Sequence, residues 1–178
     1  GGPVVNETLS TLAGKQTVDY SFNTLIDLSK TGGHTLDVWV AATGDTYTKN
    51  DSILNYSFHN QPLISSFPYK ETFENGDGNW YTQGTSDSWA YGTPASPKIN
   101  KSASGTKAWK TNLSGNYNPL ELSYLYSPCF DVMSRRYPKF RFAIAHDIED
   151  CGIVLCDGAA WQYRTDGVNW QRLHDSTQ

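Results

Sequence analysis

The sequence predicts an all-β protein built of antiparallel β-sandwiches, and three observations carry this prediction. Short stretches repeatedly alternate apolar with polar residues, which is the period of a half-buried strand. Clusters rich in Gly, Asn, Asp and Ser separate these stretches at intervals of roughly ten residues, as in known sandwiches. No stretch of the chain has the apolar period of a long amphipathic helix.

The first third of the chain predicts one antiparallel module. Three stretches alternate apolar or aromatic residues with polar ones, at residues 18–22, 36–40 and 54–58. Gly-containing clusters at residues 30–34 and 43–45 lie between them and are typical of tight turns. We therefore expect half-buried strands within a module of residues 1–60.

A short linker is expected after this module. The pairs Gln61-Pro62 and Phe67-Pro68 enclose a small apolar stretch. Proline fixes φ and lacks the backbone N–H, so we expect the stretch to run extended without continuing a strand ladder. The linker is placed at residues 61–68, and a second module at residues 69–178.

The second module also predicts strands. They are expected at residues 107–111, 123–127, 139–146 and 159–163, where apolar and polar residues alternate. Thr165-Asp166-Gly167 is a hairpin turn signal, and a return strand is expected to begin at Trp170.

Composition narrows the possible partners. The 14 Lys and Arg against 18 Asp and Glu give a formal net charge of −4, so no basic face for nucleic acid or anionic membrane is expected. No apolar run approaches the roughly 18–20 residues of a membrane helix, so we expect no membrane insertion. Aromatic residues make up 13% of the chain and charged residues 18%, which is typical of extracellular β-sandwiches.

Three cysteines, Cys129, Cys151 and Cys156, cannot all pair within the chain. Cys151 and Cys156 lie close enough in sequence to form a disulfide, and this pairing is the favoured one. Two alternatives stay open: free thiols, or a zinc site that also uses His146. The sequence leaves the pairing of Cys129 undetermined.

No catalytic motif is recognisable in the sequence. It contains no nucleophile elbow, zinc-protease motif, P-loop or dinucleotide fingerprint. The acidic run Asp147-Ile-Glu-Asp150 fits a solvated loop, with a contribution to calcium binding or two-carboxylate catalysis as alternatives. We therefore expect this chain not to be an enzyme.

Aromatic residues in loop-rich sequence are the candidate ligand-binding residues, because sugar-binding modules stack sugars on exposed rings. The candidates are Trp80, Tyr81, Trp89, Tyr91 and Tyr117. The alternative is that they pack inside the module, since Trp is usually highly buried. Three further tryptophans lie in strand contexts and are expected in the core: Trp109, Trp161 and Trp170.

Five motifs follow one another along the second module. They are residues 73–76 (Phe-Glu-Asn-Gly) with Trp80, residues 89–94 (Trp-Ala-Tyr-Gly-Thr-Pro), residues 104–109 (Ser-Gly-Thr-Lys-Ala-Trp), residues 124–131 (Tyr-Leu-Tyr-Ser-Pro-Cys-Phe-Asp) and residues 156–167 with Trp170. In this order they resemble the jelly-roll modules of large bacterial surface proteins exported by the type IX secretion system. Those modules are related in architecture to MAM domains and to the cleaved-adhesin domains of secreted proteases.

The first module carries a less specific resemblance. Residues 1–5 (Gly-Gly-Pro-Val-Val), residues 28–40, and Gly44-Asp45 followed by Asn50-Asp51 resemble the later strands of an immunoglobulin-like module of the CARDB kind. Both resemblances imply incomplete modules: a partial immunoglobulin-like sandwich followed by the first part of a jelly roll. We therefore expect the chain to be a segment of a much longer polypeptide.

The resemblance also implies a metal. Related jelly rolls hold calcium near the first strand and near the loop that precedes a Trp. Carried over by position, the ligands are Glu74 and Asp87, with Asp157 as a third and Asp77 as the runner-up. Carboxylates and loop carbonyls are the oxygen ligands that calcium prefers.

The function implied by the resemblance is that of a non-catalytic segment of a large secreted adhesin on the bacterial cell surface. Its partners are expected to be surface glycans or proteins, with the type IX export machinery as a further partner. Two alternatives stay open: a structural spacer stalk, or an accessory region of a secreted hydrolase or peptidase whose catalytic domain lies elsewhere.

Overall fold

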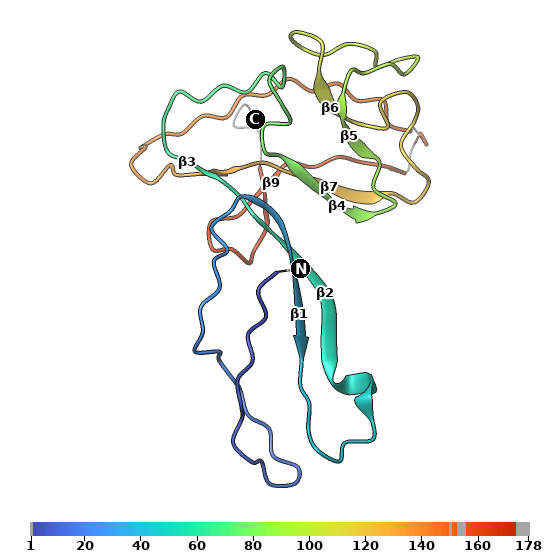
Figure 1. Cartoon of the computed structure of the whole chain (residues 1–178). Coiled ribbons are helices and arrows are strands. Elements are labelled where there is room, and N and C mark those ends of the chain that lie inside the picture. The colour runs from blue at the N-terminus through green and yellow to red at the C-terminus, as the bar shows by residue number, and fades with distance from the viewer. Residues whose placement is uncertain (1, 150, 153–155, 174–178) are drawn as a thin grey trace. The chain divides into compact units, whose positions relative to one another are not determined.

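The computed structural model describes residues 2–149, 151–152 and 156–173 (Figure 1). In these residues the chain is all-β, as the sequence predicts: its helical content is the single 3-10 turn η1 (Thr48–Asn50). The strands range from two to nine residues and form two-stranded pairs. The described residues divide into two compact units, and neither is continuous in sequence. The first unit comprises residues up to Lys70 with Gly78–Tyr81 and Tyr126–Arg136, and the second comprises Glu71–Asp77, Thr82–Leu125 and the residues from Tyr137 onward.

The first unit is built on the long hairpin of β1 (Gly32–Trp39) and β2 (Ser52–Asn60), which Figure 1 shows with η1 in the connection. The two strands pair antiparallel, and the register shifts between Leu36 and Val38. This hairpin confirms the strands predicted at residues 36–40 and 54–58. The strand predicted at residues 18–22 is wrong, because that segment has no ladder partner and is held by side-chain hydrogen bonds instead.

The Pro-bracketed stretch differs from expectation in one respect. Residues 63–66 were expected to run outside any ladder, yet β3 (Leu63–Ile64) pairs parallel with β8 (Cys129–Phe130). Cys129 N–H donates to the Pro62 carbonyl at 3.0 Å, and Asp131 N–H donates to the Ile64 carbonyl at 2.9 Å. Proline lacks only its own donor, so its carbonyl and the residues after it remain free to pair.

The second unit contains short strand pairs. β5 (Trp89–Gly92) pairs antiparallel with β6 (Ala108–Thr111), and β9 (Gln162–Tyr163) pairs antiparallel with β10 (Gln171–Arg172). A further pair joins β4 (Tyr81–Thr85) to β7 (Leu122–Tyr126), and all of its residues except Tyr81 and Tyr126 belong to this unit. These pairs confirm the strands predicted near residues 107–111 and 123–127 and the hairpin around Asp166.

The strand predicted at residues 139–146 does not form. The alternating side chains are present, but no described strand pairs with this segment, and alternation alone does not supply ladder hydrogen bonds. Its apolar side chains Phe140, Phe142 and Ile144 are consequently exposed.

Burial in the described residues is shallow. Three small residues are buried: Pro94, Ser96 and Pro128. No large apolar side chain among the described residues is buried. The prediction that Trp161 and Trp170 belong to a core is wrong, because both are exposed, whereas Trp109 is half-buried. Ring contacts and side-chain hydrogen bonds therefore carry more of the local organisation than apolar burial does.

Candidate functional site

Tyr91 and Trp109 face each other across β5 and β6 and fasten the loop before β4. Their ring centroids lie 6.0 Å apart. The Tyr91 hydroxyl donates to the Phe73 carbonyl at 2.6 Å, and the Trp109 indole N–H donates to the Asp77 carbonyl at 3.0 Å. Lys107 Nζ lies 5.5 Å from the Tyr91 ring centre. Tyr91, a predicted ligand residue, is thus half-buried and holds a loop in place.

Glu74, the first predicted calcium ligand, joins this loop to the start of β6. Its Oε1 accepts hydrogen bonds from the backbone N–H groups of Thr106 and Lys107, each at 2.8 Å, and its Oε2 accepts one from the Thr106 hydroxyl at 3.1 Å. The backbone donors of Lys107 and Thr106 hold the pKa of Glu74 below its usual range. Gly105 has φ +62°, and a Cβ there would overlap the Glu74 carboxyl group.

The other two predicted calcium ligands have separate partners. Asp87 Oδ1 accepts from the Trp89 N–H at 3.0 Å, and Asp157 Oδ2 accepts from the Tyr117 hydroxyl at 2.6 Å. No group of three His, Cys, Asp or Glu side chains able to hold a metal ion occurs in the described residues. As positioned, Glu74, Asp87 and Asp157 do not fit a shared calcium site, and calcium binding stays a prediction.

Tyr81 lies in a column of three aromatic rings. The His59 ring stacks on it with centroids 4.0 Å apart, and the Tyr126 ring stacks on it at 4.8 Å. Two rings so close and so nearly parallel to a third must lie on its opposite faces. Both faces of Tyr81 are thus occupied, and this predicted ligand residue offers no free face for a sugar. Gly33, opposite His59 in the hairpin, leaves room for the imidazole.

The loop that precedes Tyr117 is organised around a lysine. Lys110 Nζ donates to the carbonyls of Thr111, Asn112 and Gly115 at 2.8, 2.6 and 3.1 Å. Partial burial lowers the pKa of Lys110. The hydrogen bond to Asp157 raises the pKa of the Tyr117 hydroxyl. Tyr117 is half-buried, and its hydroxyl is held by Asp157.

Glu121 is a second carboxylate that joins segments distant in sequence. It accepts from the N–H and hydroxyl of Ser88, from the Asn118 N–H and from the Ser123 hydroxyl, at 2.5 to 3.2 Å. Partial burial alone would raise the pKa of Glu121, but hydrogen bonds from Ser123 and Ser88 outweigh it and lower the pKa. Sequence reasoning missed this residue, because its donors lie up to 33 positions away.

Trp80 and Trp89, the remaining predicted ligand residues, are half-buried. Trp80 belongs to the first unit with Tyr81, whereas Trp89, Tyr91 and Tyr117 belong to the second. The five predicted aromatic residues are thus divided between two units.

Cys151 and Cys156 form a disulfide, with Cα atoms 6.0 Å apart. This is the pairing that the sequence favoured, and it leaves neither thiol available for zinc. Cys129 is an exposed free thiol at the start of β8.

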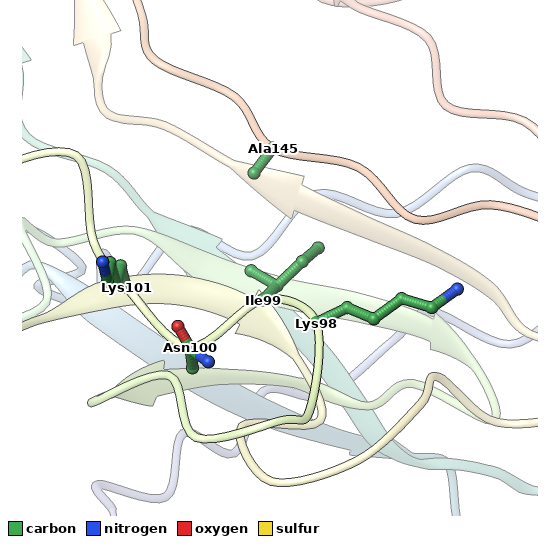
Figure 2. A pocket seen from close by; sticks show the side chains of 5 residues that line it. All are labelled: Lys98, Ile99, Asn100, Lys101 and Ala145. Atoms are coloured by element: carbon green, nitrogen blue, oxygen red, sulfur yellow. The ribbon is translucent and has the colours of Figure 1, made fainter.

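A shallow pocket of about 330 Å³ lies in the second unit, lined by Lys98, Ile99, Asn100, Lys101 and Ala145. Figure 2 shows the side chains of Ile99 and Ala145 on facing sides of it and the Lys98 side chain extending outward. Lys98 Nζ pairs with Asp147 Oδ1 at 2.9 Å. The lining thus combines two lysines and an asparagine amide with two apolar side chains.

Comparisons with known proteins give one partial similarity. No known protein family matches the chain, and no solved structure matches it. Over 82 residues, or 46% of this chain, the sequence is 34% identical to Bacillopeptidase F of Bacillus subtilis (strain 168). The chain spans 6% of the length of that protein. No helix in the described residues is long and apolar enough to cross a membrane.

Proposed function

We propose that this chain is a non-catalytic segment of a large, secreted, bacterial cell-surface adhesin whose β modules bind surface glycans or proteins. The observation that carries the proposal is the exposure of apolar and aromatic side chains along short strand pairs, with no large apolar side chain buried in the described residues. Exposed apolar surface of this extent is typical of sites that contact a partner or further polypeptide.

Exposure in the first unit supports a larger parent protein. Along the β1–β2 hairpin, Leu36, Trp39, Ile53, Leu54 and Tyr56 are all exposed. An isolated two-stranded hairpin is marginal in water and gains stability when further strands cover its apolar face. The length of Bacillopeptidase F, of which this chain spans 6%, is in keeping with such a parent.

The state of the carboxylates supports a non-catalytic role. General acid–base catalysis works best when the pKa of the group lies near the working pH. Glu74 and Glu121 instead accept several hydrogen bonds each, and these bonds lower the pKa of both groups. They act as ionised acceptors that join loops.

The disulfide supports a secreted location, because disulfides persist in oxidising compartments and are rare in the cytosol. Export by the type IX machinery rests on the resemblance of residues 73–167 to modules of its substrates. On the cell surface, repeated weak modules gain avidity because tethering raises their effective concentration.

Glycan and cell-binding measurements test the proposal. The chain, fluorescently labelled, is applied to an array of surface glycans and to bacterial and host cells. Saturable binding to a defined glycan or surface protein is expected. If labelled chain binds neither the array nor any cell, the adhesin proposal fails and the spacer stalk becomes the better account.

A second candidate is favoured by the comparison with Bacillopeptidase F: an accessory region of a secreted peptidase. In that case the chain has no peptidase activity of its own, and the catalytic domain lies elsewhere in the parent. Deleting residues 1–178 from the parent then changes its cleavage of a large substrate but not of a short peptide. Equal effects on both substrates, or none on either, would count against this candidate.

A further inference from the structure

The hairpin of β9 and β10 presents an aromatic face that includes Trp161, a residue that the sequence predicted to lie in the core. Gln171 pairs with Tyr163 across the hairpin, and Leu173 N–H donates to the Trp161 carbonyl at 2.8 Å. Residues two apart on a strand point to the same side, and cross-strand partners share that side. Trp161, Tyr163, Gln171 and Leu173 therefore form one face, which we name the hairpin face.

Two aromatic rings on the hairpin face are accessible. Trp161 is 39% exposed and Tyr163 is 44% exposed. The Phe142 ring stacks on Trp161 with centroids 3.8 Å apart, which supports one side of the indole. Within the described residues, the Tyr163 ring contacts no other ring and the Trp161 indole N–H has no hydrogen-bond partner.

The polar groups of this face are uncharged. The Tyr163 hydroxyl donates to Gln171 Oε1 at 2.9 Å, which fixes both groups at the edge of the rings. The charged side chains of the hairpin, Arg164 and Arg172, alternate with these residues and lie on the opposite side. The hairpin face thus combines ring surface with neutral donors and acceptors.

The opposite side of the hairpin is occupied by its own residues. The Arg164 guanidinium lies 4.7 Å from the centre of the Trp170 ring, and its Nη1 donates to the Gly167 carbonyl at 3.0 Å. Asp166 accepts hydrogen bonds from the N–H groups of Val168 and Asn169 at 2.9 and 2.8 Å. These contacts hold the turn and place a cation over the Trp170 ring, so the two sides of one small hairpin differ in charge.

We propose that the hairpin face binds a neutral oligosaccharide. This proposal rests on the proposed glycan-binding function and gives that function a site. The C–H faces of sugar rings stack on aromatic rings, while their hydroxyls pair with amide and hydroxyl groups. Trp161 and Tyr163 are spaced about 6.5–7 Å apart along the strand, which suits successive sugar rings of an extended chain. The absence of charge on this face selects neutral over acidic sugars.

The test measures binding of neutral oligosaccharides to the full chain and to variants of this hairpin. Trp161→Ala and Tyr163→Ala are each expected to weaken the affinity for the best neutral oligosaccharide by on the order of tenfold or more. Trp161→Phe retains a ring and is expected to keep most of the affinity. Trp170→Ala is the matched control, since Trp170 is 43% exposed but lies on the occupied side. Circular dichroism of each variant checks that its strands persist.

The outcomes separate this site from the broader function. Unchanged affinity in both Trp161→Ala and Tyr163→Ala overturns the hairpin site but leaves glycan binding intact, and variants such as Trp89→Ala then locate it. If Trp170→Ala lowers the affinity as much as Trp161→Ala does, the assignment of the sugar site to the hairpin face is overturned. A wild-type chain that binds no neutral sugar overturns the site, while binding to proteins or acidic glycans would still preserve an adhesive role.

Discussion

At the scale of single residues, carboxylates that accept several hydrogen bonds organise this protein. Glu7 is the clearest example: its oxygens accept from the Tyr20 hydroxyl at 2.5 Å, from the Asn23 N–H at 3.0 Å and from the Thr24 N–H at 2.8 Å. Glu74 and Glu121 serve the second unit in the same way. Each joins backbone segments that no strand ladder connects.

Acid is expected to release the Glu7 contacts. The hydrogen bond from Tyr20 and those from Asn23 and Thr24 lower the pKa of Glu7 from 4.5 to about 2. Because the folded-state pKa is depressed, this stabilisation is present above about pH 4.5 and is lost as the pH falls towards about 2. The protection factor of the Thr24 amide, which is its intrinsic exchange rate divided by the rate measured by NMR at the same pH, should fall through that range.

Two variants make this prediction specific. In Glu7→Gln, which has no charge to lose, the protection factor of the Thr24 amide is expected to be low at every pH in the range, with no further acid step. Asp19→Asn removes a neighbouring carboxylate that makes no hydrogen bond within the described residues, and it should behave like wild type. If the acid step persists unchanged in Glu7→Gln, a group other than Glu7 causes it.

Gly105 is expected to be intolerant of a side chain. Its φ of +62° is strained for an L residue, and a Cβ would overlap the carboxyl group of Glu74. Gly105→Ala should lower the free energy of unfolding by roughly 1–3 kcal/mol. Urea unfolding measures this, with Gly158→Ala as the control because Gly158 faces open space. Similar midpoints for the two variants would contradict the proposed role of the Glu74 contacts.

At the scale of secondary-structure elements, aromatic contacts supplement strand pairs that are too short to be stable alone. β3, β8, β9 and β10 have only two residues each. The stack of His59, Tyr81 and Tyr126 holds the end of β2 in the first unit, and Phe142 on Trp161 supports the β9–β10 hairpin in the second. Ring contacts therefore add to the few ladder hydrogen bonds of these elements.

Removing the central ring of the three-ring column tests this account. Tyr81→Ala deletes two stacked pairs of about 0.5–1.5 kcal/mol each, so the free energy of unfolding should fall by about 1–3 kcal/mol. Tyr47→Ala is the control, because Tyr47 is 62% exposed and makes no ring contact within the described residues. Equal unfolding midpoints for the two variants would show that the column adds no stability.

At the scale of the whole molecule, two expectations concern the state of the chain in solution: its disulfide and its metal content. Cys151 and Cys156 are bridged and Cys129 is free. The sequence-derived calcium ligands Glu74, Asp87 and Asp157 each have a different hydrogen-bond partner. Both the disulfide and the metal content can be measured on the unmodified chain.

Alkylation under denaturing, non-reducing conditions should label only Cys129. After reduction, all three cysteines should be labelled. Intact mass before and after reduction counts the labels, and peptide mapping assigns them. Three labels without reduction would show that the thiols of Cys151 and Cys156 are free in the isolated protein.

EDTA tests the calcium site that the resemblance implies, because removal of a bound calcium should lower the melting temperature. In this structure the carboxylates of Glu74, Asp87 and Asp157 have different hydrogen-bond partners, so they would have to move together to share one ion. Differential scanning calorimetry with calcium and then with EDTA measures the effect, and magnesium is the control ion. A calcium-specific rise that EDTA reverses would establish the metal site that the resemblance implies.

The sequence by itself determined the all-β class, the two strands that pair as β1 and β2, and the turn at Asp166, because alternation and turn chemistry are local properties. It also favoured the Cys151–Cys156 disulfide, since the two residues are close in the chain. Tertiary structure alone decided which alternating stretches became strands: residues 18–22 and 139–146 alternate but have no described partner. It likewise decided that Tyr81 is enclosed and Trp161 exposed, because a ring's surroundings come from residues distant in sequence.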